Sequence, residues 1–105
     1  MNTQFKKGII ELCIMKLVSN EDASGIALIE ELSSRLDVSE NTVYPILRRL
    51  TKQGYFTTFK KNIGVGAPRK YYALTDDGKE QLIIYENEWA SFLKEVTEIL
   101  GGYNG

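Results

Sequence analysis

The 105-residue sequence contains no histidine and only one cysteine. Without histidine, the chain lacks the most common general base and the most common metal ligand. A single cysteine forms no intramolecular disulfide and cannot complete a zinc site of the usual kind. The chain also lacks paired catalytic carboxylates on a shared face and a phosphate-binding glycine pattern. We therefore expect no enzyme, no catalytic residue, no metal and no cofactor.

Long apolar runs are absent as well. A transmembrane helix needs roughly 20 apolar residues, and Glu11 and Lys16 interrupt the most hydrophobic stretch. Lys6 and Lys7 resemble the start of a signal peptide, but Glu11 and the lack of a small-residue cleavage site argue against one. We expect a single cytoplasmic domain without a membrane partner. A chain this short also favours an oligomer that shares surface.

Acidic residues are missing from one long block. The net charge is −1, yet residues 41–72 hold seven of the 13 cations and none of the 14 acidic residues. The seven cations are Arg48, Arg49, Lys52, Lys60, Lys61, Arg69 and Lys70. Because phosphate binding depends on local potential, this block predicts a contact with nucleic acid. The alternative is a solvated face whose cations pair with acidic residues from elsewhere in the fold.

Three helices are predicted in the first half of the chain. Residues 5–18 are apolar on nearly every side, which is typical of a buried helix, and Cys13 within it is expected to be a small buried hydrophobe. Residues 24–36 form a second helix capped by Ser24, and residues 39–53 a third capped by Ser39 and ended by Gly54. Two helices joined by a short connector, the second rich in cations, indicate a helix-turn-helix.

Two strands are predicted directly after the third helix. Residues 55–59 and 70–74 are aromatic and β-branched, and the segment 62–68 between them carries the glycines and the proline of a turn. A long hairpin at this place in the chain is typical of a wing. The fold class predicted is therefore mainly α (α+β), a winged helix-turn-helix with a long C-terminal dimerisation helix.

The last predicted helix is capped by Thr75 and reaches about residue 100. Apolar residues repeat along it at heptad spacing, namely Leu82, Tyr85, Trp89, Phe92, Val96 and Ile99. We expect this seam to be the main contact of a homodimer, and the alternative is that the helix packs back on its own domain. The chain then divides into a DNA-binding domain at residues 1–74 and a dimerisation helix with a short tail at residues 75–105.

The third helix is predicted to bind double-stranded DNA in the major groove. Its outer face and flanks run from polar residues near the N-terminus to cations near the C-terminus. The candidate base contacts are Asn41 (amide to adenine), Thr42 and Tyr44 (hydroxyls to bases or phosphates) and Arg48 (to guanine or phosphate). Phosphate contacts are expected from the other cations. The full candidate set is Ser39, Asn41, Thr42, Tyr44, Pro45, Arg48, Arg49, Lys52, Lys60, Lys61, Arg69 and Lys70.

Pro45 breaks a local rule within this helix. Counted from Ser39, it stands several residues inside, where a proline removes a backbone hydrogen bond and costs about 3 kcal/mol. Such a residue on a cationic face suggests a function or a kink. The alternative is that the helix begins near Tyr44, with Pro45 in its first turn. The sequence leaves both open.

Two linked motifs resemble the PadR family of bacterial transcriptional regulators. Residues 41–50 (NTVYPILRRL), followed by Gly54 and Tyr55, resemble the family's recognition helix. Residues 66–75 (GAPRKYYALT), followed by Gly78, resemble its wing and the start of its dimerisation helix. The single C-terminal helix resembles the smaller PadR-like subgroup. The resemblance implies a homodimer, usually a repressor, that binds a two-fold symmetric operator and often responds to a small molecule.

Trp89 is the one candidate residue for binding an effector. In some members of the family, aromatic residues on this helix line a cavity for flat apolar compounds, whereas the position of Trp89 in the seam also fits a dimer core. The leading hypothesis is a ligand-responsive DNA-binding repressor. The alternative is a winged-helix module that binds protein and not DNA. The acid-free block favours the first, because a protein-binding face gains nothing from excluding every acidic residue over such a length.

Overall fold

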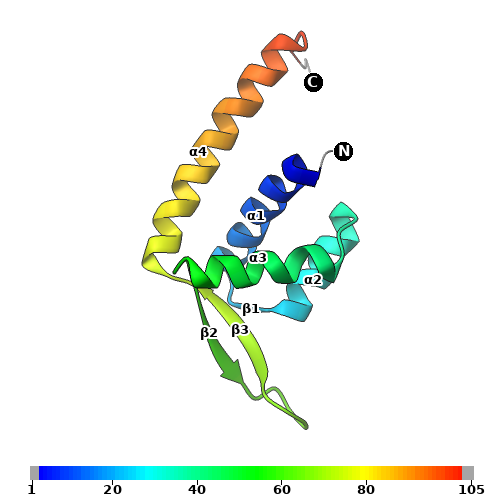
Figure 1. Cartoon of the computed structure of the whole chain (residues 1–105), viewed down its shortest axis with the longest axis vertical. Coiled ribbons are helices and arrows are strands. Elements are labelled where there is room, and N and C mark those ends of the chain that lie inside the picture. The colour runs from blue at the N-terminus through cyan, green and yellow to red at the C-terminus, as the bar shows by residue number, and fades with distance from the viewer. Residues whose placement is uncertain (1–2, 103–105) are drawn as a thin grey trace.

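The structure, a computed structural model, describes the backbone of residues 3–102 and the side chains of residues 7–102. The end of the predicted C-terminal tail, residues 103–105, lies outside the described residues. The elements follow in the order α1 (Thr3–Asn20), β1 (Ala23–Ser24), α2 (Gly25–Leu36), α3 (Glu40–Lys52), β2 (Phe56–Lys61), β3 (Arg69–Leu74) and α4 (Asp76–Ile99). The predicted winged helix-turn-helix is confirmed, with α2 and α3 as the two helices and β2–β3 as the wing (Figure 1).

The sheet has three antiparallel strands in the order β1-β3-β2. In the wing, Phe56 pairs with Leu74 at the base and Lys61 with Arg69 at the outer end. The hairpin extends away from the helices, on the side opposite to the free end of α4 (Figure 1). The third strand, β1, is only two residues long, and it pairs Ala23 with Tyr72. This short strand was not predicted, and it joins the start of α2 to the middle of the wing.

The helix starts agree with their predicted caps at two of three places. The Ser24 hydroxyl accepts a hydrogen bond from the Ala27 N–H at 3.1 Å, and the Thr75 hydroxyl accepts one from the Gly78 N–H at 3.0 Å. Ser39 occupies the N-cap position of α3, but its side chain makes no capping hydrogen bond. Ser39 therefore positions the helix start through its backbone alone, and its predicted side-chain cap is wrong.

The core lies where α1, α2 and α3 meet the base of the wing. Its largest fully buried side chains come from α1 and α3, and they are Ile10, Ile14, Met15, Val18, Val43, Ile46, Leu47 and Leu50. Leu28 and Leu32 of α2 and Phe56 and Tyr72 of the wing complete it. Cys13 is only partly buried and packs at the edge of this core, where burial raises the pKa of its thiol. The helices therefore share one core, against which both the wing and α4 are fixed.

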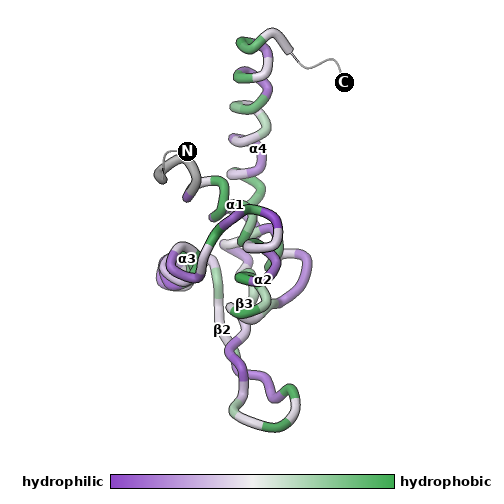
Figure 2. Tube along the Cα trace, turned by 90° about the vertical axis from the view of Figure 1, so that its right-hand side faces the viewer, coloured by the Kyte–Doolittle hydropathy of each residue, from purple (hydrophilic) through white to green (hydrophobic). Residues whose placement is uncertain are grey.

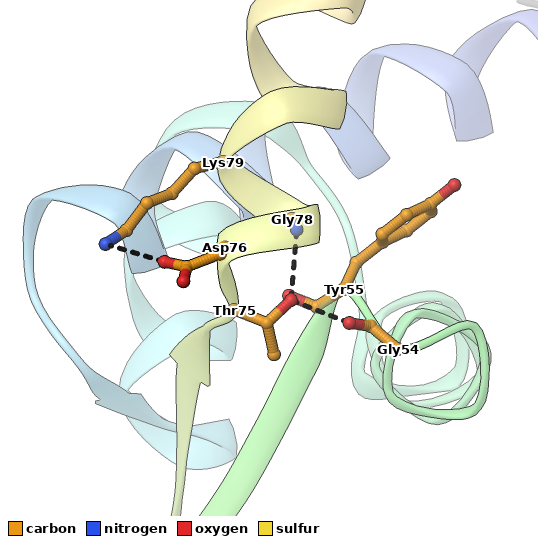
Figure 3. A network of polar contacts seen from close by, with 6 residues as sticks. All are labelled: Gly54, Tyr55, Thr75, Asp76, Gly78 and Lys79. Atoms are coloured by element: carbon orange, nitrogen blue, oxygen red, sulfur yellow. Dashed lines mark hydrogen bonds and ion pairs between the residues drawn. The ribbon is translucent and has the colours of Figure 1, made fainter.

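The start of α4 is joined to the end of α3 by a tight backbone contact (Figure 3). The Thr75 hydroxyl donates to the Gly54 carbonyl at 2.6 Å, and the Thr75 N–H donates to the Tyr55 carbonyl at 3.0 Å. A Cβ at Gly78 would lie 2.3 Å from the Tyr55 carbonyl oxygen and 2.6 Å from Leu74 Cδ1. Only glycine fits at position 78 while this contact is kept. We call the contact between Tyr55, Thr75 and Gly78 the α3–α4 joint.

The apolar seam of α4 divides into two halves. Leu82 is 5% exposed and belongs to the core of its own domain, so its predicted place in a dimer interface is wrong. Tyr85 also packs against that core, and Trp89 lies beside Gly8 of α1. The C-terminal part of α4 extends past the domain (Figure 1), and the exposed apolar residues after Trp89 are Phe92, Leu93, Ile99 and Leu100. None of the helices within residues 3–102 combines the length and apolar character that a membrane span needs.

Replacing Gly78 with alanine is expected to destabilise the fold by about 2–4 kcal/mol, because the new methyl group collides with a backbone oxygen that cannot move alone. The matched control is Gly8→Ala in α1, where the added Cβ meets only Trp89 Cζ2 at 3.8 Å. That change should stabilise the helix by about 0.5–1 kcal/mol. Urea unfolding of all three proteins at one concentration measures both effects. Equal stabilities for the two variants would contradict the claim that the α3–α4 joint requires glycine at position 78.

Candidate nucleic-acid interface

Helix α3 presents a buried face and an exposed face, as its sequence period predicts. Val43, Ile46, Leu47 and Leu50 are buried, whereas Asn41, Pro45, Arg48 and Lys52 are exposed. The exposed residues lie along one line of the helix, with the polar amide at the N-terminal end and Lys52 at the C-terminal end. This outer face is the part of the molecule that has the shape and the polarity to enter a major groove.

Pro45 lies inside α3, because the helix begins at Glu40 and Pro45 is in its second turn. The alternative of a helix start near Tyr44 is therefore wrong. The missing N–H leaves the Asn41 carbonyl without its usual partner four residues on, on the exposed face. A shallow cavity of about 320 Å³ is lined by Glu40, Asn41, Tyr44, Pro45 and Arg48. Glu40 was not predicted as a site residue.

The two flanks of α3 are held by different neighbours. On one flank, the Tyr44 ring lies against Gly25 at the start of α2, where a Cβ would stand 3.0 Å from Tyr44 Cε1. On the other flank, Arg49 forms an ion pair with Glu11 of α1. Thr42 is half-buried and Ser39 is exposed at the helix start. The structure therefore brings Tyr44 toward the wing side and turns Arg49 toward α1.

Arg49 forms an ion pair, whereas its neighbour Arg48 forms none within the described part of the chain. The Glu11 side chain is 16% exposed and the Arg49 side chain 44%, so the pair is partly shielded from water. Tyr85 of α4 lies close to the pair. Burial raises the pKa of Tyr85, the Glu11 carboxylate raises it further, and Arg49 lowers it. Arg49 was predicted to bind DNA, but its contacts make it a link between α3, α1 and α4.

The wing carries four exposed cations, Lys60, Lys61, Arg69 and Lys70. Register places Lys60 opposite Lys70 and Lys61 opposite Arg69, so the wing carries two neighbouring cation pairs, one on each face of the hairpin. Aromatic rings lie next to the cations of the wing. Phe59 stacks on Tyr71 at 5.6 Å between centroids, and the Lys61 ammonium lies 5.4 Å from the Tyr71 ring. Figure 2 shows the hydrophilic stretch of the hairpin, with hydrophobic positions toward its tip.

The cations of the wing and of the outer face of α3 have no carboxylate partners within the described part of the chain. The ion pairs found there use Lys16, Arg35, Arg49 and Lys79. We call the remaining group the cationic surface, and it consists of Arg48, Lys52, Lys60, Lys61, Arg69 and Lys70. The alternative that acidic residues fold back to neutralise this block is not supported by the described side chains, apart from Arg49. The described side chains also contain no acidic or cysteine cluster arranged to hold a metal ion.

The helix-turn-helix, the attached wing and the long fourth helix define the class of winged-helix transcriptional regulators. Comparison with known proteins gives the family. The model of the transcriptional regulator PadR-like family matches residues 14–83, and the chain belongs to this family. Its members are transcriptional regulators and not enzymes. The match runs from the middle of α1, across the whole α3–wing unit, into the first part of α4.

Individual relatives agree with this assignment. The chain is 34% identical to a PadR-like transcriptional regulator from Bacillus cereus, with a TM-score of 0.86 over 96% of this chain and 100% of that one. A PadR family regulator from Eggerthella lenta is 32% identical, with a TM-score of 0.81 over 92% of this chain and 86% of that one. The negative transcriptional regulator PadR of Bacillus subtilis is 33% identical over 70% of this chain. The match spans only 43% of the Bacillus subtilis protein's length.

The adjacent arginines of α3 should separate stability from DNA binding. Arg49→Gln is expected to lower the free energy of unfolding by about 1 kcal/mol, because it leaves the half-shielded Glu11 carboxylate unpaired. It should leave the affinity for DNA nearly unchanged. Arg48→Gln should lower the affinity for DNA and leave the free energy of unfolding nearly unchanged. Urea unfolding and fluorescence anisotropy with a labelled duplex measure the two quantities, and a larger loss of affinity in Arg49→Gln would contradict the assignment.

Proposed function

We propose that this regulator is a repressor that binds a two-fold symmetric operator as a homodimer and responds to a small apolar ligand. The observation that carries the DNA-binding part is the cationic surface, which spans α3 and the wing and has no acidic partner among the described side chains. In major-groove docking, Asn41 and Thr42 near the start of α3 reach base edges. Lys52 and the wing cations bind the flanking phosphates.

The homodimer is supported by the uncovered part of α4. The helix has 24 residues, and its C-terminal part extends past the domain (Figure 1). The exposed apolar residues there are Phe92, Leu93, Ile99 and Leu100, with half-buried Val96 between them. A surface of this kind on a helix of about 36 Å is best covered by the same helix of a second copy, since a symmetric pair hides both faces at once. Two copies then present two recognition helices.

Two further observations support repression and ligand response. The Bacillus subtilis relative carries the name negative transcriptional regulator. Trp89 meets Phe92 edge to face, with ring centroids 5.9 Å apart, and Trp89 also lies beside Gly8 of α1. A flat apolar compound stacking on these rings would change how two α4 helices pack. Because the α3–α4 joint fixes α3 to α4, a change in α4 tilt alters the spacing of the two recognition helices.

Selection of bound fragments from the source organism's genomic DNA tests this function. At about 0.15 M salt we expect enrichment of an inverted repeat whose half-sites are centred one or two helical turns apart. Recovery of no fragment, with no binding to any duplex at low salt, would contradict DNA binding.

The same selection tests the dimer. Leu93→Lys places a charge on the exposed apolar face and should yield a monomer that no longer enriches a repeat. Ser91→Lys, on the opposite side of α4, is the matched control and should behave as the unaltered protein. Sedimentation measures the mass of each. A dimer in Leu93→Lys would place the interface elsewhere.

Trp89 is the only tryptophan in the chain, so its fluorescence reports on this position alone. Titration with planar apolar compounds should quench it in a saturable manner, and the same compounds should release the selected DNA. Phe92→Ala should weaken the quenching several-fold, because it removes the second ring. If no compound in a broad panel quenches saturably, Trp89 serves packing only and the ligand response has no site here.

A further inference from the structure

A cavity of about 420 Å³ lies between the start of α2, the middle of α3 and the strand β3. The charged and polar residues that line it include Tyr44, Arg48, Arg69 and Lys70, and Gly25 and Ile26 line it at the start of α2. No acidic side chain lines it. Three cationic residues from two separate elements therefore line one cavity, and this convergence was not predicted, because residues 48 and 69 lie far apart in the sequence.

Two features of the chain build this cavity. The pairing of Ala23 with Tyr72 through β1 brings the middle of the wing beside the start of α2. Gly25 then leaves room for the Tyr44 ring, whose hydroxyl would stand 3.5 Å from a Cβ at that position. A larger residue at position 25 would push the ring into the cavity. The tyrosine is thus held by packing at the edge of the cavity that it lines together with the cations.

The charges in the cavity are not compensated from within the described part of the protein. Arg48, Arg69 and Lys70 take part in no ion pair there. The Lys70 ammonium lies 5.6 Å from the centroid of the Tyr72 ring, on the wall of the cavity. Burial raises the pKa of the Tyr72 hydroxyl and Tyr44 raises it further, while the nearby Arg48 guanidinium lowers it. Three cations close together without a counter-charge repel one another, and an anion between them removes that repulsion.

We propose that this cavity binds one phosphate of the DNA backbone, held jointly by Arg48 from α3 and by Arg69 and Lys70 from the wing. The Tyr44 hydroxyl donates a fourth contact. The inference rests on the proposed DNA binding and refines it, because it assigns Tyr44 and Arg48 to a phosphate and not to a base. A phosphate bound there would fix the angle between recognition helix and wing. Base reading then falls to Asn41 and Thr42.

Anisotropy titrations with two duplexes of different sequence, one A·T-rich and one G·C-rich, test the assignment. Arg48→Gln and Arg69→Gln should each weaken binding to both duplexes by the same factor, because every sequence offers the same phosphate. In the double variant, the slope of log affinity against log salt should fall by only about 0.9, the value for one phosphate. A fall of about 1.8 would mean two separate phosphates and would overturn the shared site. A change in the ratio between the duplexes would show base contacts and also overturn it.

Gly25→Ala tests the cavity without changing any charge. The new methyl group displaces Tyr44, so affinity for both duplexes should fall several-fold while the thermal stability is kept. Gly8→Ala is the matched control and should not change affinity. If the unaltered protein binds neither duplex, the proposed function fails together with the inference. If it binds both and Gly25→Ala, Arg48→Gln and Arg69→Gln bind equally well, the inference alone fails.

A free phosphate anion has the same chemistry as the backbone phosphate, and a third arm separates the two. Millimolar inorganic phosphate is added at constant ionic strength, with chloride removed to compensate. The proposal expects unchanged affinity for DNA, because an isolated anion lacks the many other contacts of a duplex. A several-fold loss in the unaltered protein that is absent from the Arg48→Gln/Arg69→Gln variant would show that the cavity holds a free anion, and would overturn the assignment to DNA.

Discussion

The rest of the structure depends on the close approach of Gly78 to the Tyr55 carbonyl. At this point the chain leaves α3, enters the wing, returns from it and begins α4, so four segments meet within a few residues. Thr75 holds these segments together just after α3: its hydroxyl donates to the Gly54 carbonyl (Figure 3), and its N–H donates to the Tyr55 carbonyl. A side chain at position 78 would separate α4 from α3. The start of α4 is therefore fixed next to the end of α3.

The neighbours of α3 hold it on every side except its outer face. One flank of the helix is fixed to α2 through Tyr44 and Gly25, and the other to α1 through Arg49 and Glu11. The core face is buried among the other helices. The only side left is the one that carries Asn41 and Arg48, next to the wing cations. A family of regulators that docks two such faces on DNA needs this kind of fixed geometry, because half-sites are spaced by the pitch of the double helix.

Much of the fold follows from local patterns in the sequence. The apolar period of α3, the capping residues Ser24 and Thr75, and the glycine after α3 predict the elements to within a few residues. The strand β1 escaped prediction because two residues carry no period, and only the pairing with Tyr72 creates it. Adjacent arginines look alike in a sequence, and only the position of Glu11 on α1 separates Arg49 from Arg48.

The site follows less fully from the sequence than the fold does. The acid-free block located the cationic surface, but it could not show which cations converge, since that depends on the approach of the wing to α2. Leu82 and Phe92 share one heptad seam, yet Leu82 lies in the core and Phe92 is half exposed, because α1 covers only the first part of α4. A helical period identifies an apolar face without saying which neighbour covers it.

Amide hydrogen exchange of the protein, alone and bound to a duplex, tests most directly that the α3–wing face is where DNA docks. We expect the backbone amides of α3, of the wing and of the start of α2 to exchange more slowly when DNA is bound, and those of the exposed end of α4 to exchange at an unchanged rate. Protection confined to α4 or to the outer side of α1, with α3 and the wing exchanging as in the free protein, would contradict it.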